Sequence, residues 1–119
     1  MKHDILTSRV LRCFYDVYNS LGAGYNESIY SAALAIALRD AGISFRREHF
    51  VDVFFREQKV GSYRVDYLVD DNVILELKAG HQLPPGSKAQ LMSYLQSAKK
   101  EVGLLLFFGP TPEAQRLTV

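Results

Sequence analysis

The sequence lacks the features that support a disulfide framework, a membrane span or a strongly basic surface. Cys13 is the only cysteine, so no internal disulfide can form, and tryptophan is absent. No apolar segment approaches the roughly 18 residues that cross a bilayer, and the N-terminus has no continuous apolar stretch of the kind that begins a secreted protein. Lysine and arginine number 14 against 13 aspartates and glutamates, so any contact with a polyanion must come from a local arrangement of charge. We therefore expect a cytoplasmic protein without a membrane partner.

The composition that remains is typical of a soluble globular domain. Hydrophobic residues make up 48% of the 119 positions and charged residues 23%, far from the profile of a disordered chain. A chain of this length can bury a hydrophobic core. The sequence predicts a single domain over residues 1–119, with Cys13 as a small core residue.

The spacing of apolar residues changes along the chain from the helical period to the strand period. It predicts a helix over about 4–20 and a second over about 27–41, with Asn26 as N-cap and Gly42 closing the second helix. Val, Phe, Tyr and Ile then alternate with polar residues, which predicts three strands that pair antiparallel. The three strands are expected at 49–55, 60–69 and 73–79. A helix over 87–99 and a buried strand over 102–108 follow, and the pattern assigns no structure to the tail from Gly109.

In the stretch "VDYLVDDNVILELKAG", residues 65–80, Asp66 interrupts one apolar run and Glu76 and Lys78 interrupt a second. A three-residue loop at 70–72 would put Asp66 opposite Glu76 and Arg64 opposite Lys78, all on one face of the sheet. Two facing carboxylates repel unless a cation lies between them. Mg²⁺ is held by one or two carboxylates and keeps positions open for water and a phosphate oxygen. The pattern therefore indicates a metal-dependent phosphodiesterase in which Lys78 stabilises negative charge on the phosphate.

An ordinary network of ions across the two strands is the alternative to a metal site. Exposed pairs of this kind contribute only about 0.2–1 kcal/mol each. The apolar neighbours Leu68 and Ile74 share the face with the charges, which favours the functional interpretation because half-buried charges need compensation.

Four blocks of the chain resemble the bacterial and archaeal GxxExxY proteins. They are the Gly24, Glu27 and Tyr30 of "GYNESIY", the Asp66 of "YRVD", the Glu-x-Lys of "VILELKA", and the Gln-x-x-x-Tyr of "AQLMSYL". The resemblance covers nearly all of residues 4–118. That family is placed in the PD-(D/E)XK nuclease-like superfamily. The resemblance implies an α/β fold, a three-layer α/β/α sandwich around a mixed sheet, with a restriction-endonuclease-like core and an extra N-terminal helix.

The resemblance also implies roles for particular residues. Asp66 and Glu76 would hold Mg²⁺ or Mn²⁺ with Glu27 as an auxiliary acid, Lys78 would be the catalytic lysine, and Gln90 and Tyr94 would brace the site and substrate. Each has a structural alternative. Glu27 suits the first turn of a helix, Gln90 and Tyr94 could form a polar rim, and Tyr30 is expected to pack in the core.

The substrate contacts are expected to come from nearby cations. Tyr63 and Arg64 of "YRVD" could steady a phosphate, although Arg64 could instead pair with Asp66 or Glu76. The stretch before Gln90 is "GSKAQ", with Ser87 and Lys88 where family members often carry a histidine followed by a polar residue. If that histidine assists catalysis in other members, its absence here would lower the rate of catalysis and leave metal binding intact. Lys88 could add a phosphate contact.

The sequence thus predicts a Mg²⁺- or Mn²⁺-dependent nuclease acting on DNA or RNA. Two alternatives remain open at this point. One is a non-catalytic nucleic-acid-binding or assembly module that retains the nuclease fold, and the other is an enzyme acting on a smaller phosphate ester. The sequence is also compatible with a homodimer that embraces a duplex.

Overall fold

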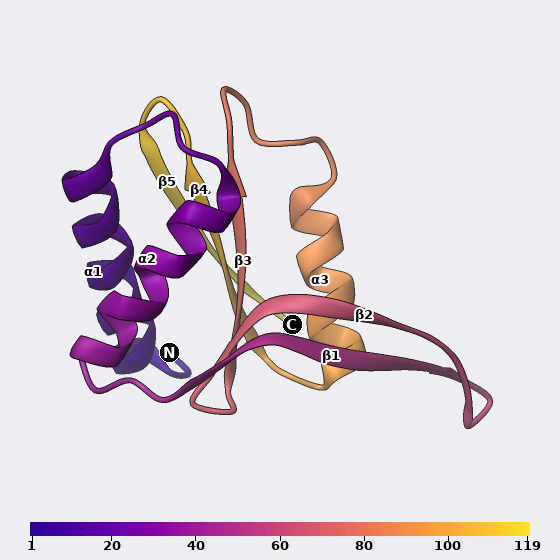
Figure 1. The fold of residues 1–119 in the computed structure, drawn as a ribbon. Helices are drawn as coiled ribbons and strands as arrows, with labels where there is room; N and C mark the ends of the chain where they lie inside the picture. Colours follow the sequence, from indigo (N-terminus) through magenta and orange to yellow (C-terminus); the bar gives the residue numbers. More distant parts are fainter.

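The computed structural model describes all residues from 1 to 119 and contains three helices and one five-stranded sheet (Figure 1). The helices are α1 (Asp4–Leu21), α2 (Glu27–Asp40) and α3 (Ser87–Ala98). The strands are β1 (Phe45–Phe55), β2 (Gln58–Val69), β3 (Val73–Ala79), β4 (Val102–Phe108) and β5 (Pro112–Thr118). No helix is both long enough and apolar enough to span a bilayer.

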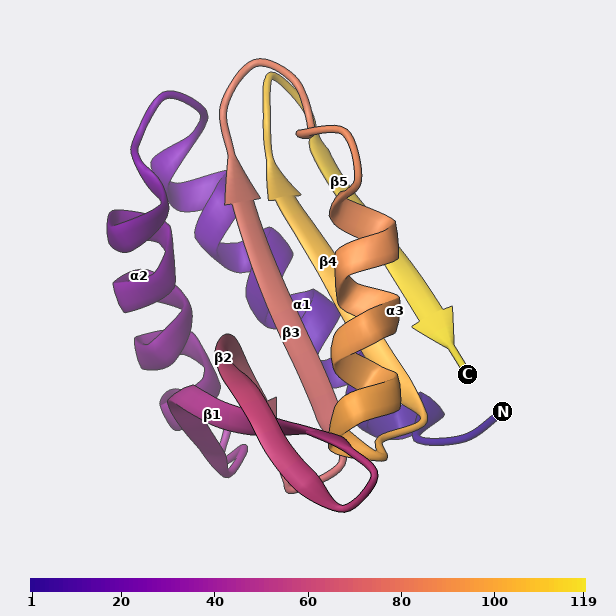
Figure 2. The ribbon, with the colours of Figure 1, turned by 90° about the vertical axis from the view of Figure 1, so that its right-hand side faces the viewer.

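The strands lie in the order β1-β2-β3-β4-β5, and only β3 and β4 run parallel. Helix α3 makes the crossover between these two parallel strands, as a parallel pair requires. Helices α1 and α2 cover one face of the sheet and α3 covers the other (Figure 2). The predicted three-layer α/β/α sandwich around a mixed sheet is confirmed.

Strand boundaries differ from the prediction in two places. The first strand begins at Phe45, where it pairs with Val69, and so is four residues longer than expected. The second begins at Gln58, two residues earlier than expected, because a two-residue turn at Arg56 and Glu57, both with positive φ, joins the two strands. The tail forms a fifth strand, which begins at Pro112, a position where an edge strand tolerates proline. Its residues are mostly half-buried, so the alternation that would reveal a strand is weak.

The hydrophobic core has two layers, one on each face of the sheet. Leu75 and Leu77 of β3 point into the layer beneath α1 and α2, together with Cys13 and Tyr30. Ile74 points into the other layer, which we call the α3 core and which contains Val51, Val65, Leu68, Ile74, Leu91, Leu95 and Leu105. Gly103 lets α3 approach closely, because a Cβ there would lie 3.1 Å from a methyl carbon of Leu91.

Strands β2 and β3 pair over only three residues. The pairs are Val69 with Val73, Leu68 with Ile74 and Tyr67 with Leu75, which confirms the predicted loop and register. Beyond Tyr67 the ladder stops, and β2 continues with β1 as a long hairpin that crosses the end of α3 (Figures 1 and 2). Arg64 therefore pairs with Phe50 of β1. The expected ladder pairs of Asp66 with Glu76 and of Arg64 with Lys78 are both wrong, because the β2–β3 ladder ends at Tyr67.

The departure of β2 breaks the alternation of its side chains. Val65 and Leu68 are three residues apart, yet both pack in the α3 core. A regular strand would put them on opposite faces. The bend lies between them, at Asp66, where the β2–β3 ladder has ended. We call this place, where β2 and β3 part, the opening.

Candidate active site where two strands part

Asp66 and Glu76 lie on the two sides of this opening, and each carboxylate binds the backbone of the other strand. The N–H of Leu77 donates to Oδ2 of Asp66 at 2.7 Å. The N–H of Asp66 donates to Oε1 of Glu76 at 3.1 Å. The two side chains thus accept from two backbone N–H groups, those of Asp66 and Leu77, that have no ladder partner where the strands diverge. The same bonds hold both carboxylates in one place.

The protein compensates poorly for negative charge on the two carboxylates. Glu76 is 5% exposed, and burial followed by the charge of Asp66 raises its pKa to about 8. Burial also raises the pKa of Asp66, while the hydrogen bond from Leu77 and the charge of Lys78 act in the opposite direction. Raised pKa values of this kind mean that the protein disfavours the ionised forms of the two groups, which a bound cation would favour.

Glu27 and Lys78 share the environment of the two carboxylates. Glu27 is exposed at the first turn of α2, and its pKa is raised by burial of the carboxyl group and by the charge of Asp66, while Lys78 lowers it. Lys78 is half-buried and forms no ion pair. The structure therefore brings all four groups to one opening from α2, β2 and β3.

The donor set fits a divalent cation with some coordination left to water. No three His, Cys, Asp or Glu side chains are close enough together to hold one ion. The half-buried Asp66 and the buried Glu76 supply the hard oxygen donors that Mg²⁺ prefers, and Mg²⁺ commonly takes only one or two carboxylates. The charge of Asp66 acts on Glu27, but Glu27 is not close enough to Asp66 and Glu76 for all three to coordinate one ion.

Tyr94 of α3 borders the opening and is stacked on Tyr63 of β2. The ring centroids are 4.1 Å apart with an interplanar angle of 24°. The hydroxyl of Tyr63 donates to the backbone oxygen of Ser93 at 3.3 Å, which ties the hairpin to α3. Burial and then the charge of Glu76 raise the pKa of Tyr94, as expected for a phenol beside the acids.

The remaining predicted contacts lie at the surface. Gln90 and Lys88 are exposed on α3, where Gln90 forms no side-chain hydrogen bond and Lys88 no ion pair. Arg64 lies 3.7 Å from Glu48 Oε2, and both side chains are exposed, so the pair contributes little to stability. Arg64 thus pairs with Glu48 and with neither of the two carboxylates suggested for it by the sequence.

Glu48 is a charged neighbour of the site that the sequence did not reveal. The β1–β2 ladder pairs Arg47 with Tyr67 and His49 with Val65, and it is interrupted at Glu48 and Asp66 between them. Glu48 has a positive φ of 53°, and its charge contributes to the raised pKa of Asp66. The expected strand began only at residue 49, so Glu48 lay outside it.

Tyr30 packs in the core, as expected, and fixes the loop that leads to Glu27. Its ring stacks on Phe108 with the centroids 4.2 Å apart. Its hydroxyl donates to the carbonyl of Gly22 and accepts from the N–H of Tyr25. The side chain of Asn26 then caps α2 by accepting from the N–H of Ile29, as predicted. These contacts determine where Glu27 begins the helix.

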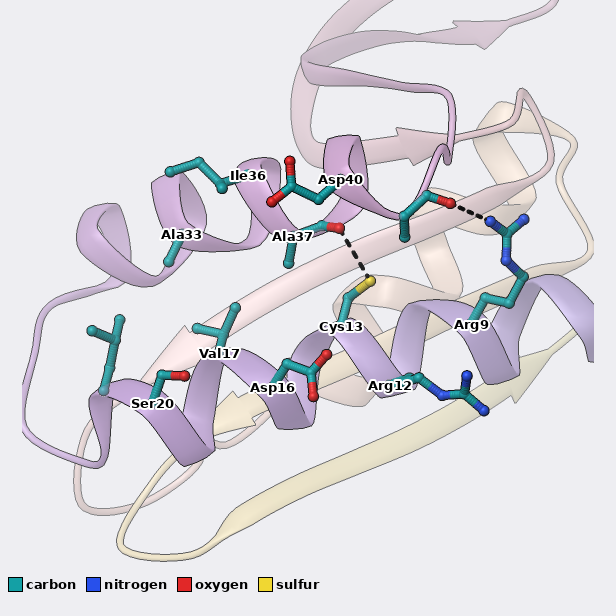
Figure 3. Close-up of a pocket in the computed structure, with 12 residues that line it drawn as sticks. Arg9, Arg12, Cys13, Asp16, Val17, Ser20, Ala33, Ile36, Ala37 and Asp40 are labelled. Atoms are coloured by element: carbon teal, nitrogen blue, oxygen red, sulfur yellow. Dashed lines mark hydrogen bonds between the residues drawn. The ribbon is translucent and has the colours of Figure 1, made fainter.

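A groove of about 650 Å³ lies elsewhere, between α1 and α2 (Figure 3). Cys13 and Ala37 line it, and the Cys13 thiol donates a hydrogen bond to the Ala37 carbonyl. Arg12 and Asp16 lie at its rim. None of the predicted site residues lines it. The acid site is therefore identified by its chemistry and not by the size of a cavity.

The sandwich architecture, together with an acid and a Glu-x-Lys pair at a break in the sheet, defines a restriction-endonuclease-like fold. The sequence profile of the PD-(D/E)XK nuclease superfamily matches residues 4–117, and the chain belongs to this superfamily.

Comparison with solved structures gives the same fold. The crystal structure of SSO0001 is similar to this chain with a TM-score of 0.58 and 18% sequence identity, over 76% of this chain and 48% of that one. The chain thus spans about half the length of that protein, and at this identity the likeness concerns the fold alone. The search of curated proteins found no match.

Proposed function

We propose that this protein is a nuclease that hydrolyses phosphodiester bonds with Mg²⁺ or Mn²⁺ held by Asp66 and Glu76. The observation that carries the proposal is the pair of carboxylates of Asp66 and Glu76, each fixed by a backbone hydrogen bond, whose ionised forms a divalent cation would stabilise. Membership of a superfamily whose nucleases generally use divalent metals supports it. We further propose that the whole chain acts as one nuclease-like domain of the GxxExxY kind.

The metal ion would supply Lewis-acid chemistry, polarising a phosphoryl oxygen and increasing the acidity of water. The chain's own residues would supply the remainder. Glu27, within electrostatic range of the pair, would assist through water. Lys78, an ammonium group without a carboxylate partner, would donate to the phosphoryl oxygens as negative charge develops on them.

The substrate would lie across the opening between β2 and β3, with α2 on one side of it and α3 on the other. Gln90 and Tyr94 are four residues apart and so project from one face of α3. Tyr94 borders the acids and would contact the nucleotide next to the scissile bond, with Gln90 beside it. Lys88 and Arg64 would contact phosphates further out, Arg64 after releasing its weak pair with Glu48.

A cleavage screen tests the proposal. Labelled single-stranded, duplex and branched DNA and RNA would be incubated with Mn²⁺ and the parent protein, with the Asp66→Asn, Glu76→Gln double variant, and with Glu113→Gln. Glu113 is an exposed acid on β5 without an ion pair, so its variant is the matched control. We expect the parent and the control to cleave at least one substrate and the double variant to cleave none. Equal cleavage by parent and double variant would refute the assignment.

The alternative of a non-catalytic module is favoured by one observation, the absence of any three acids close enough to hold one ion. Calorimetric titration of Mn²⁺ into the parent and into the double variant separates the two functions. Heat of binding in the parent alone supports the nuclease. No heat in the parent, together with binding of nucleic acid, would favour the module.

A further inference from the structure

Arg47 is held in a fixed position by two other elements of the fold. Its Nη2 donates to the hydroxyl oxygen of Ser31 on α2 at 3.1 Å. Its guanidinium carbon lies 5.7 Å from the centre of the Tyr67 ring on β2. Tyr67 is fully buried, and its own hydroxyl donates to the backbone oxygen of Ser31. The arginine head is therefore restrained by a hydrogen bond and by a rigid aromatic ring.

This anchored arginine lies on the α2 side of the acid site. Ser31 follows Glu27 by four residues, so the two share one face of α2 a single turn apart. Tyr67, the register partner of Arg47, directly follows Asp66 in β2. Two independent links thus connect Arg47 to the acid site: Ser31 lies one helical turn from Glu27, and Tyr67 is the next residue along the strand from Asp66.

Arg47 has no carboxylate partner, whereas three other cations in or next to this part of the sheet are paired. Arg64 is paired with Glu48, Lys59 with Asp52 and Lys100 with Asp71, at N–O distances of 3.7, 3.3 and 3.7 Å. The guanidinium of Arg47 has five N–H donors, and only the bond to Ser31 uses one of them. The donors left free suit a phosphate, which arginine can bind in a bidentate manner.

We propose that Arg47 binds a backbone phosphate of the nucleic acid next to the scissile phosphate, on the α2 side of the site. Ser31 and Tyr67 are positioning residues that hold the guanidinium in place. This inference rests on the proposed function and extends it, because it assigns the direction in which the substrate strand leaves the acids, towards α2. The chain's net charge of +1 makes such a local contact important for affinity.

Arg46 is the matched control. It is the adjacent residue, it is also exposed and it also forms no ion pair. It pairs with Leu68 and lines a small cavity with Lys100 and Asp71 on the other side of the strand, away from Ser31. Any general effect of removing a positive charge from β1 will therefore appear equally in both variants.

The test measures affinity for a fluorescein-labelled 20-mer, as single strand and as duplex, by fluorescence anisotropy over a range of salt concentrations. Ca²⁺ replaces Mn²⁺ so that binding is followed without turnover. Arg47→Ala should raise the Kd about tenfold, lower the slope of log Kd against log salt by about 0.9, and leave the sequence preference unchanged. Arg46→Ala should change the Kd less than twofold. Arg47→Lys keeps the charge without the planar fork and should lie between.

A double-variant cycle tests the positioning role. Ser31→Ala should weaken binding two- to threefold when Arg47 is present and have no effect in the Arg47→Ala background. Thermal unfolding of each variant separates loss of binding from loss of folding, and Arg47→Lys retains a cation beside Tyr67 should Arg47→Ala be unstable.

Two results would count against the inference in different ways. Equal weakening by the Arg46 and Arg47 variants, or an unchanged salt slope in Arg47→Ala, would overturn the role of Arg47 while leaving the nuclease proposal intact. A parent protein that binds neither form of the 20-mer at low salt would overturn both.

Discussion

Asp66 and Glu76 each bind the other's strand and do not bind each other. The Asp66 carboxylate accepts from the backbone of Leu77, and the Glu76 carboxylate accepts from the backbone of Asp66. This exchange closes the gap between two strands that part after three residue pairs. The same two groups therefore have a structural role in the sheet and a proposed role in metal binding, and variants can separate these roles.

Asp66→Ala should be less stable than Asp66→Asn, and both variants should lose metal binding. Alanine leaves the Leu77 N–H without an acceptor, which costs about 1–3 kcal/mol, whereas the asparagine oxygen can keep that bond. Both changes remove an anionic metal ligand, so Mn²⁺ binding should be lost in both. Urea unfolding and calorimetry measure the two effects, and retention of full Mn²⁺ affinity in either variant would contradict the assignment.

The stability of the metal-free protein should depend on pH through Glu76. Its folded pKa of about 8 lies above the ordinary value of 4.5, so the folded state binds the proton more tightly than the unfolded state. The resulting stability is fully present below pH 4.5 and is lost as pH rises to about 8, by an amount on the order of a few kcal/mol. Urea unfolding in EDTA between pH 5 and 9 measures it.

Glu76→Gln is the control for this pH dependence, because the amide is neutral at every pH. The variant should lose most of the slope and should be more stable than the parent at pH 8.5. Mn²⁺ should restore stability to the parent at high pH and leave the variant unchanged. A parent whose unfolding free energy is flat from pH 5 to 9 would contradict the raised pKa of Glu76.

Lys78→Ala should abolish cleavage and preserve metal binding. The ammonium group is half-buried beside the acids and forms no ion pair, so removing it deletes a positive charge from the opening without breaking a salt bridge. Loss of one such stabilising donor typically lowers kcat about 10²- to 10³-fold. Cleavage assays and Mn²⁺ calorimetry on the same preparation check both parts, and undiminished cleavage would remove Lys78 from the mechanism.

The stacked pair of Tyr63 and Tyr94 should couple the hairpin to α3. In a double-variant cycle of Tyr63→Leu and Tyr94→Leu, their coupling free energy should be about 0.5–1.5 kcal/mol in addition to the free energy of burying each ring. Tyr63→Phe keeps the stack and loses only the bond to Ser93, so it serves as the conservative control. Additive losses of unfolding free energy would show that the rings do not support each other.

Much of the fold follows from local patterns in the sequence. Asn26 caps α2 because its side chain accepts a hydrogen bond from Ile29, and Gly42 closes the helix with a φ of 73°. The loop at 70–72 sets the register of Val69 with Val73, and the period of two separates Leu75 and Leu77 from Ile74 and Glu76. Each of these features depends on residues only a few positions apart.

The fifth strand and the length of the hairpin were not evident from the sequence for related reasons. Residues 112–118 are mostly half-buried, so polar and apolar residues do not alternate clearly. Arg56 and Glu57 adopt positive φ at the hairpin turn without being asparagine or glycine. Pairing with the neighbouring strand determines both conformations, and local propensity does not.

The sequence by itself determined every element except β5, the sheet register beside the loop and the four charged groups Glu27, Asp66, Glu76 and Lys78. Only the tertiary structure decided that β2 leaves β3 after Tyr67, that Arg64 meets Glu48, and that Arg47 reaches Ser31. The physical reason is that Val51 and Val65 are buried against α3, which bends the hairpin out of the sheet. Residues 51, 65 and 91 are far apart in the chain, and a local pattern carries no information about their contact.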